Sequence, residues 1–415
     1  MLINNFKPSV QFNFLNTYPD IRELRGIVKS ILTLFCYITF VVSPWASATL
    51  SAPRMPSIEA RSYILIDVDS GQILAARDPN VRVEPASTTK LMTAYLVFQA
   101  LKENRIALDQ RITVSDTSWR KPGSSMYIDT RMHVPVDDLI KGMLVQSGND
   151  ATNLLAETLG GTTGGFVSTM NAQARLLGMS STTFKNPEGL PTPGHLTTAH
   201  DLAILGIRIL EDFPEYSHYF SIKHYYYPGT PPSNGTNRNQ LLFRDSSVEG
   251  LKTGHTDAAG YCLVASAARS FGHYGKRRIV AVVLGAKSER KRADETQKLI
   301  NWGFRTYTAV KLDIKGTTYE TIKIWKGEKT FIKLGIAPSA IAVPAKSVAD
   351  IDTQFDIPQP LSAPIVEGQQ VGLMKVSLNG QLLREIPVTA LEEIKEANFF
   401  VRLWDSLVLL FKSLF

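Results

Sequence analysis

The strongest constraint on the fold is where strand-like segments lie in the first 310 residues. Residues 63–78, YILIDVDSGQILAARD, alternate apolar and polar side chains on both sides of Asp69-Ser70-Gly71, which predicts a β-hairpin. Three more strand-like runs, SVEGLKTG, GYCLVASAAR and RRIVAVVLGA, follow only between residues 247 and 286. Strands at both ends of a segment with helices between them predict an α+β fold, an antiparallel sheet covered by helices.

Helical patterns fill the interval between the strands. Residues 86–102 predict one helix, and residues 134–158 predict two helices that are broken near Ser147-Gly148-Asn149. A further helix is expected at 198–210, with Thr198 as its cap. After the last strand, ADETQKLINWGFRTY predicts a closing helix.

The pattern changes near residue 310. From there to about residue 388 the side chains alternate as in strands, and VSLNGQLLREI contains the Asn-Gly pair that is typical of tight hairpins. We therefore expect a small β-rich, sandwich-like domain over residues 310–390.

Residues 391–415 change character again and predict an amphipathic helix. A narrow polar stripe separates the apolar side chains, and the longest uninterrupted apolar run, 407–411, is too short to cross a membrane. The stripe consists of Lys395, Asn398, Arg402, Asp405 and Lys412. Such a terminal helix suits the membrane interface, while the alternative is a helix that docks on the protein's own core.

The N-terminus has the features of a secretory signal. Four basic residues precede the apolar run SILTLFCYITFVV, and Ala46-Ser47-Ala48 provides the small residues of a cleavage site. Residues 1–48 are therefore expected to be a signal peptide, the alternative being a retained anchor. Cleavage would remove Cys36 and leave Cys262 as a lone thiol, so no intramolecular disulfide is expected.

Composition excludes several classes of protein. At 44% hydrophobic and 20% charged residues, the chain is neither wholly disordered nor a polytopic membrane protein. The net charge of +7 is mild, and no basic run with interleaved aromatic residues occurs, so no nucleic-acid partner is expected.

The first candidate for chemistry is the pair Ser87 and Lys90. Residues three apart share a helix face, so the lysine amine can reach the serine hydroxyl. Pro85 suits a sharp helix start, where the dipole adds positive potential and lowers the pKa of a lysine. A neutral, buried lysine can act as general base for a serine nucleophile. By itself, however, this pair is more commonly a capping serine near a surface lysine.

Two later motifs add polar groups. Ser147 and Asn149 place a hydroxyl and an amide in a break between helices, where they could relay a proton and hold a substrate amide; alone they would indicate an interhelical turn. Lys252-Thr253-Gly254 offers a cation and a hydroxyl to a carboxylate at a strand end, and its glycine permits close backbone approach.

Together, at spacings of 60 and 105 residues, the three motifs resemble those of the penicillin-recognising serine enzymes. The segments PASTTKLMTAY, LVQSGNDAT, NPEGL, NRNQLL, VEGLKTGHTDAAGYCLVASA and LINWGF resemble the low-molecular-mass D-alanyl-D-alanine carboxypeptidases. The resemblance implies a β-lactamase/penicillin-binding-protein-like catalytic domain over residues 55–309. The later β-rich domain and amphipathic helix match the layout of that family.

The resemblance also implies a role for each motif residue. Ser87 would form an acyl-enzyme after giving its proton to Lys90, and Ser147 would relay a proton to the leaving D-alanine. Asn149 would bind the substrate backbone.

The substrate-binding residues are implied in the same way. Lys252, Thr253 and Gly254 belong to the third motif, and the backbone N–H groups of Ser87 and His255 would form the oxyanion hole. Arg238 and Arg292 match arginines near the site, and Arg292 is a candidate for the terminal carboxylate. No cofactor and no metal are implied.

The implied function is removal of the terminal D-alanine from peptidoglycan pentapeptides, which limits cross-linking, together with acylation by β-lactam antibiotics. The enzyme would be exported and held peripherally, through residues 391–415, at the periplasmic face of the cytoplasmic (inner) membrane.

Several other functions have sequence requirements of their own. A Ser–His triad through His255 lacks the G-x-S-x-G motif, and metal binding by His195 and His200 lacks a third ligand at sensible spacing. A β-lactamase would need a deacylation base, and Glu188 is followed by prolines rather than by the expected asparagine. A transpeptidase or endopeptidase stays open, and a non-catalytic binder is disfavoured because all three motifs are intact.

Overall fold

The computed structural model describes residues 54–414 with gaps at 230, 232–233, 271–275 and 313–319. The signal peptide predicted for residues 1–48 lies outside these residues. The described chain forms two compact units. One contains residues 54–311 with 340–345, and the other contains residues 312–339 with 346–414.

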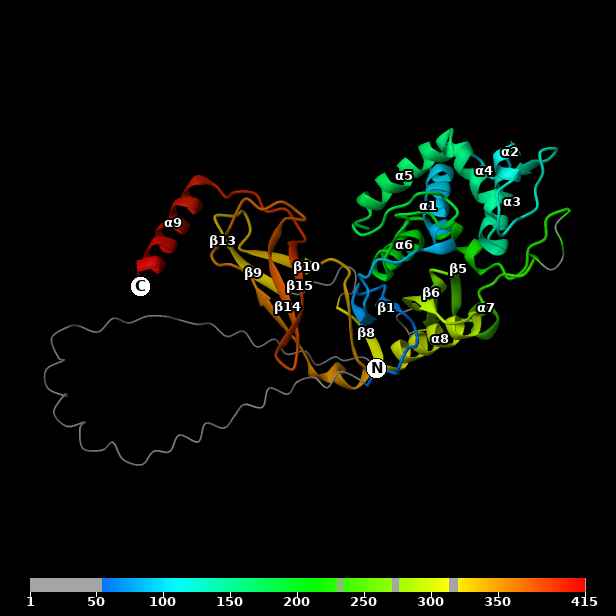
Figure 1. Ribbon diagram of the computed structural model, residues 1–415. Helices are drawn as coiled ribbons and strands as arrows, with labels where there is room; N and C mark the ends of the chain where they lie inside the picture. The colour runs from blue at the N-terminus through cyan, green and yellow to red at the C-terminus, as the bar shows by residue number, and fades with distance from the viewer. Residues whose placement is uncertain (1–53, 230, 232–233, 271–275, 313–319, 415) are drawn as a thin grey trace, which may run out of the picture. The chain divides into compact units, whose positions relative to one another are not determined.

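The first unit is built on a five-stranded sheet (Figure 1). Its strands are β1 (Ser62–Asp67), β2 (Ile73–Arg77), β5 (Val248–Thr256), β6 (Gly260–Ser270) and β7 (Lys276–Ala286). Their order is β2-β1-β7-β6-β5, and every neighbouring pair is antiparallel. The predicted hairpin, the three later strands and the α+β class are therefore confirmed. Because β5 is an edge strand, one side of it is free of sheet partners.

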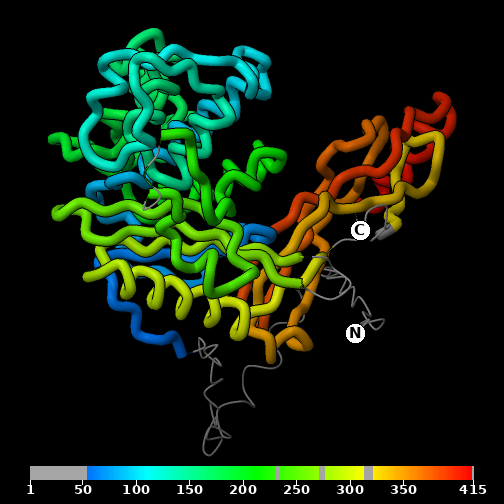
Figure 2. The backbone as a smooth tube through the Cα atoms, turned by 90° about the vertical axis from the view of Figure 1, so that its right-hand side faces the viewer, coloured from blue at the N-terminus to red at the C-terminus, as the bar shows by residue number. Residues whose placement is uncertain are grey.

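Helices cover both faces of this sheet (Figure 2). One face carries α1 (Lys90–Lys102), α3 (Val136–Lys141), α4 (Asn149–Gly160), α5 (Thr163–Leu176) and α6 (Ala199–Asp212). The other face carries α8 (Glu289–Thr306), which begins four residues before the predicted helix because Ser288 caps it. Shorter elements are η1 (Ala86–Thr89), β3 (Arg111–Thr113), α2 (Asp116–Trp119), β4 (His133–Pro135), η2 (Gly142–Gln146), η3 (Pro214–Ser221) and α7 (Leu241–Arg244).

The strands send alternate side chains into two cores. Ile64, Val264 and Val282 pack with the helices around α1, whereas Leu65, Leu263 and Val283 pack with α8. This alternation follows from the period of two in a strand, and it explains why a sheet covered on both faces reads as nearly continuous apolar sequence. Cys262 on β6 is a buried free thiol, and burial raises its pKa to about 11.

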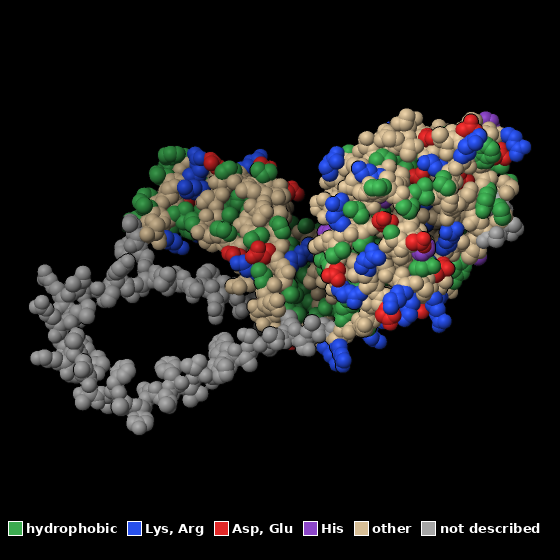
Figure 3. Space-filling view, viewed as in Figure 1, with side chains coloured by type: hydrophobic (Ala, Val, Ile, Leu, Met, Phe, Trp, Pro, Cys, Tyr) green, Lys and Arg blue, Asp and Glu red, His purple; other side chains and the backbone are tan. Residues whose placement is uncertain are grey.

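The surface of this unit carries mixed charge. Lys and Arg side chains are interspersed with Asp and Glu side chains over the face seen in Figure 3. On that face there is no extended patch of a single sign of the kind that tracks a nucleic-acid backbone.

The second unit is β-rich, as predicted. Its sheet has the order β12-β14-β15-β10-β9-β13. The strands are β9 (Glu320–Trp325), β10 (Phe331–Ile336), β12 (Ile351–Asp356), β13 (Leu361–Ser362), β14 (Gln370–Leu378) and β15 (Gln381–Ala390). The predicted Asn-Gly hairpin joins β14 to β15, and both turn residues have positive φ, 49° at Asn379 and 79° at Gly380, as a type I′ turn requires.

One pairing was not predicted. The strand β11 (Ala340–Pro344) leaves the second unit and pairs with β8 (Tyr307–Lys311), so it belongs to the first unit. This long-range pairing has no local sequence signal.

The C-terminal helix, α9, spans Phe399–Leu414. Residues 391–398, which the sequence predicts to be helical, are not helical, and Ile394 forms a bridge with Ile365. The polar stripe of α9 faces its own unit: Asp405 Oδ2 accepts a hydrogen bond of 2.6 Å from the Lys326 N–H, and the Lys412 ammonium lies 5.2 Å from the centre of the Trp325 ring.

The apolar side of α9 is left uncovered. Its exposed side chains are Phe399, Phe400, Val401, Leu403, Trp404, Leu407, Leu410 and Phe411. Within the described ranges, no helix has the length and hydropathy needed to cross a membrane.

Candidate active site

Ser87 lies in the short helical turn η1, which runs directly into α1. Ala86 just before it has a φ of +48°, which is strained for a residue with a Cβ. The strain is held in place because Gly189 packs against this turn, where a Cβ would lie 1.9 Å from the Ala86 carbonyl oxygen. Strain of this kind, maintained by tight surroundings, is typical of functional sites.

Lys90, one helical turn later, is completely buried. Its Nζ lies 3.0 Å from Ser87 Oγ, 2.7 Å from Asn149 Oδ1 and 2.7 Å from the Glu188 carbonyl oxygen. Burial is the main cause that lowers the pKa of Lys90, to about 7. The charges of Glu188 and Asp150 oppose this shift, whereas Arg238 reinforces it.

These contacts orient the neutral amine. The Asn149 amide donates through Nδ2 to the Pro122 carbonyl at 2.7 Å, which assigns its oxygen to Lys90. That oxygen and the Glu188 carbonyl can only accept hydrogen bonds. A neutral Lys90 therefore gives its two N–H groups to them, and its lone pair faces the hydroxyl of Ser87.

Ser147 and Lys252 form a second serine–lysine pair. Ser147 ends the π-helical turn η2 with a φ of +59°, and Lys252 Nζ donates to its Oγ at 3.1 Å and to the Thr253 carbonyl at 3.1 Å. Lys252 is buried, and burial holds its pKa well below the usual value. The positive charges of Lys90, Arg238 and Arg292 act in the same direction.

Gly254 brings the edge strand β5 up to the turn η1, which carries Ser87. A Cβ at this position would lie 3.0 Å from the Pro85 carbonyl oxygen and 3.1 Å from the backbone nitrogen atoms of Ser87 and Thr88. The close backbone approach predicted for this glycine is thus present. The three sequence motifs, 60 and 105 residues apart, meet at one site.

Comparison with known proteins identifies the family. Residues 48–288 match the family described as D-alanyl-D-alanine carboxypeptidase, and residues 307–396 match the penicillin-binding protein 5 C-terminal domain. The chain belongs to the D-alanyl-D-alanine carboxypeptidase family.

Individual relatives agree with this assignment. D-alanyl-D-alanine carboxypeptidase DacC from Escherichia coli (strain K12) is 36% identical over 401 residues, 94% of this chain and 97% of the relative. Penicillin binding protein 5 from Haemophilus influenzae has a TM-score of 0.78 at 34% identity, covering 83% of this chain and 100% of that structure. Penicillin-binding protein D2 from Listeria monocytogenes, solved in an ampicillin bound form, has a TM-score of 0.54 at 32% identity, covering 61% and 100%.

These matches confirm the predicted fold class and show that this carboxypeptidase is a serine-type hydrolase of the penicillin-binding protein group. The roles of the individual residues rest on the geometry of the site.

The two arginines of the carboxypeptidase have different surroundings. Arg238 is exposed and donates to Ser124 Oγ at 3.0 Å. Arg292 is buried, forms an ion pair with Glu289 at 3.0 Å, and donates to the Arg238 carbonyl at 3.1 Å. The guanidinium of Arg292 thus supports the backbone of Arg238.

The histidines take no part in a triad within the described residues. The ring of His255 stacks on Tyr261, with 4.0 Å between ring centres, and no hydrogen bond joins it to Ser87. His195 is buried, accepts from the Lys185 N–H at 2.8 Å through Nδ1 and contacts Thr89 Oγ1 at 2.8 Å through Nε2. Burial lowers the pKa of His195 to about 4, so the ring is a neutral structural element. Residues 54–414, apart from the gaps, contain no cluster of three or more metal-ligating side chains.

Two participants were missed by sequence reasoning. Glu188 was considered only as a β-lactamase base, yet its carbonyl holds Lys90 and its carboxylate forms an ion pair with Lys121 at 2.6 Å. Ser124 carries a hydroxyl that contacts Arg238 and a carbonyl that accepts from the Asn149 N–H at 2.7 Å. Both contacts are long-range, and no local pattern in the sequence indicates them.

Proposed function

We propose that the enzyme removes the terminal D-alanine of peptidoglycan pentapeptides through an acyl-enzyme on Ser87. The observation that carries this proposal is the 3.0 Å contact between Lys90 Nζ and Ser87 Oγ, with the other N–H groups of the amine held by acceptors. A pKa near 7 leaves a large neutral fraction of Lys90 at neutral pH.

In acylation, Ser87 Oγ attacks the carbonyl carbon of the penultimate D-alanine while its proton passes to Lys90. The developing oxyanion would be stabilised by the backbone N–H groups of Ser87 and His255. Gly254, which precedes His255 on β5, brings that strand against the Ser87 backbone and so supports this assignment. The C–N bond then breaks, and Ser147 relays a proton to the leaving amine. Water hydrolyses the ester and restores Ser87.

Recognition of the substrate would rest on its free carboxylate. Arg238 places positive charge near the Ser87 and Ser147 hydroxyls, and Lys252 offers an amine whose protonated form an arriving carboxylate would stabilise. Thr253 offers a hydroxyl, and Arg292 holds the backbone of Arg238. Asn149 lies at the same site, where its amide could contact the substrate backbone once it releases Pro122. β-Lactams present a comparable carboxylate and an acylating carbonyl, in line with the ampicillin bound relative.

The location of the enzyme is proposed from its two ends. Residues 1–48 would direct export and be removed. Residues 55–309, together with the strand β11, would form the catalytic domain, and the rest of 310–390 would form the β-rich domain. The tail 391–415 would hold the enzyme peripherally at the periplasmic face of the cytoplasmic membrane, since α9 turns its polar stripe inward and its apolar side outward.

The test is a mass measurement on the purified protein. Benzylpenicillin should add one covalent adduct, which peptide mapping should place on Ser87, and Ser87→Ala should lose both the adduct and D-alanine release. Lys90 and Ser147 variants with intact folding provide the comparison. An adduct on another residue would refute the proposed nucleophile.

A further inference from the structure

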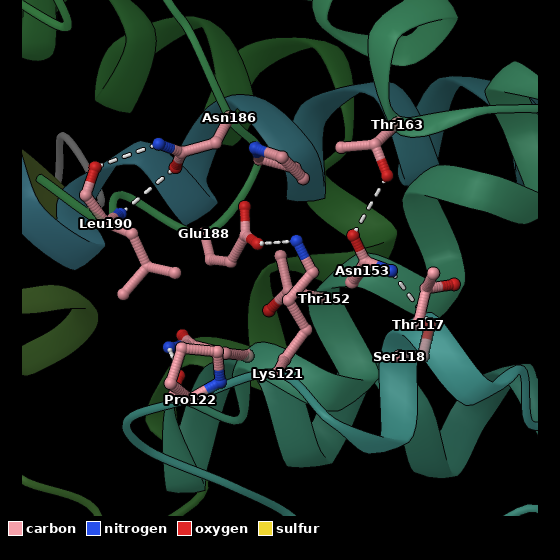
Figure 4. A network of polar contacts seen from close by, with 12 residues as sticks. Thr117, Ser118, Lys121, Pro122, Thr152, Asn153, Thr163, Asn186, Glu188 and Leu190 are labelled. Carbon is pink, nitrogen blue, oxygen red and sulfur yellow. Dashed lines mark hydrogen bonds and ion pairs between the residues drawn. The ribbon is translucent and has the colours of Figure 1, made fainter. Parts of the chain in front are cut away.

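Next to Lys90 lies an ion pair that has no part in the catalytic steps proposed above. The Glu188 side chain is wholly buried, and its carboxylate contacts the Lys121 ammonium at 2.6 Å (Figure 4). Lys121 follows α2 and is itself 22% exposed, so it reaches inward from the surface. Glu188 belongs to the segment that also packs Gly189 against the turn η1.

The buried carboxylate of Glu188 has a partner of opposite charge, Lys121. Among the described residues, neither carboxylate oxygen has a hydrogen-bond donor beyond the ion pair with Lys121. A buried carboxylate without a counter-charge would be strongly destabilised. Asp150, the other carboxylate that acts on Lys90, differs because it accepts from the Met126 N–H at 2.8 Å and from the Ser125 hydroxyl at 2.6 Å.

We propose that Glu188 and Lys121 form a positioning pair that sets how readily Lys90 carries a proton, and that Glu188 does not itself act as a base. The proposal rests on the role of Lys90 given above. The Glu188 main chain fixes the amine through its carbonyl, and its side chain supplies the opposing charge. Lys121 acts through Glu188, because its ammonium contacts that carboxylate at 2.6 Å and is the counter-charge of the buried side chain.

Three other charged side chains lie around Lys90 or the neighbouring Lys252 site. Asp150 approaches from α4, Arg238 from the segment before α7, and Lys252 from β5. Asp150 and Glu188 favour the protonated amine, while Arg238 favours the neutral amine. Of the two carboxylates, Glu188 is the one that can be neutralised without depriving loop backbone N–H groups of an acceptor, since Asp150 accepts from the Met126 N–H.

The sign of the effect follows from these charges. Glu188→Gln removes an attraction for the protonated amine, so the pKa of Lys90 falls further. Acylation requires neutral Lys90, so the acid limb of the pH–rate profile for acylation should move to lower pH. An opposite charge close to a buried amine changes its pKa by about one to three units, so we expect a shift of at least about one pH unit. Well below the wild-type limb, acylation should then be about tenfold faster than in the wild type.

The experiment measures the rate of acylation by nitrocefin between pH 5 and 9 on the full-length enzyme. Four proteins are compared: the wild type, Glu188→Gln, Lys121→Arg and the double variant Glu188→Gln/Lys121→Gln. Lys121→Arg keeps the counter-charge, so the acid limb of this variant should lie at the same pH as that of the wild type. The double variant should match Glu188→Gln, because Lys121 acts only through Glu188. The double variant buries two neutral side chains, so it also tests the proposal if Glu188→Gln does not fold.

Three results would overturn the proposal. The first is an unchanged acid limb in both the single and the double Glu188 variants. The second is a displacement in the double variant well beyond that of Glu188→Gln, which would mean that Lys121 acts directly. The third is slower hydrolysis of the acyl-enzyme with no change in the acylation limb, which would make Glu188 a water-activating base. Failure of the proposed function itself would look different, since the wild type would then carry no adduct on Ser87.

Discussion

Removing aromatic surface from α9 should weaken membrane binding without affecting catalysis. Phe400 and Trp404 are one turn apart on the uncovered side of the helix, and they are 80% and 68% exposed. We expect Phe400→Ser/Trp404→Ser to reduce partitioning onto vesicles strongly. The polar contacts of α9, such as the Asp405 bond to the Lys326 N–H, are left in place.

The magnitude follows from the exposed area. With roughly 200 Å² for each aromatic side chain, the two together expose roughly 300 Å². At about 25 cal/mol per Å², complete burial would contribute about 7 kcal/mol. A helix lying in the interface buries about half of such surface, so we expect a loss of about 3 kcal/mol. Since 1.4 kcal/mol corresponds to a factor of ten, partitioning should fall by about a hundredfold.

The assay is co-sedimentation with vesicles of mixed zwitterionic and anionic phospholipid, alongside D-alanine release from a soluble pentapeptide. Phe331→Ser is the matched control, because Phe331 is 55% exposed but lies on β10 and not on α9. It should bind vesicles like the wild type. Equal binding by the double variant and the wild type, with catalysis intact in both, would refute the membrane role of this face. Salt should have little influence on vesicle binding, because Arg402 already forms an ion pair with Glu396.

Three further predictions concern the catalytic pair and its neighbour. Lys90→Arg should be nearly as inactive as Lys90→Ala, because arginine keeps its proton and cannot serve as base; stopped-flow acylation that stays substantial in the arginine variant would contradict this. In the wild type, acylation should fall about tenfold per pH unit below pH 7, because the pKa of Lys90 is about 7 and the neutral amine is the active form; a rate that does not change between pH 5 and 9 would rule out Lys90 as base. Lys252→Ala should impair cleavage of a peptide with a free C-terminal carboxylate more than cleavage of its amidated analogue, and comparable loss on both would show that Lys252 serves the chemical steps.

The sequence predicted those parts of the fold whose cause is local. The hairpin at residues 63–78 follows from alternation about a turn, and the Asn379-Gly380 hairpin follows from two residues that tolerate positive φ. Thr198 caps α6 by accepting from the Asp201 N–H at 3.0 Å, as its position predicted.

The errors lie where tertiary contacts overrode a local pattern. Residues 391–398 carry helix-forming side chains, but Ile394 is buried by pairing with Ile365, so the helix begins only at Phe399. The strand β11 leaves the β-rich unit to pair with β8, which no periodicity can reveal. In the site, the motif positions followed from the resemblance. The Glu188–Lys121 pair did not, because its two residues are 67 positions apart and Lys121 lies in none of the resembling segments.

The two buried lysines differ in how many of their N–H groups already have acceptors. Lys90 is enclosed by Ser87, Asn149 and the Glu188 carbonyl, so no donor position remains for substrate. Lys252 donates to Ser147 and to the Thr253 carbonyl, and no described residue takes its third N–H.

The charge of Lys90 lowers the tendency of Lys252 to be protonated, and Arg238 adds to this effect. An arriving substrate carboxylate would offset that repulsion most at Lys252, which still has a hydrogen bond to give. We therefore expect carboxylate binding to favour a charged Lys252 while Lys90 stays available as the neutral base. Binding of a substrate analogue with a free carboxylate should then be accompanied by proton uptake. An amidated analogue should take up none, and calorimetry in buffers of different ionisation enthalpy can measure the difference. Equal proton uptake by both analogues would place the titration elsewhere and separate Lys252 from the recognition of the terminal carboxylate.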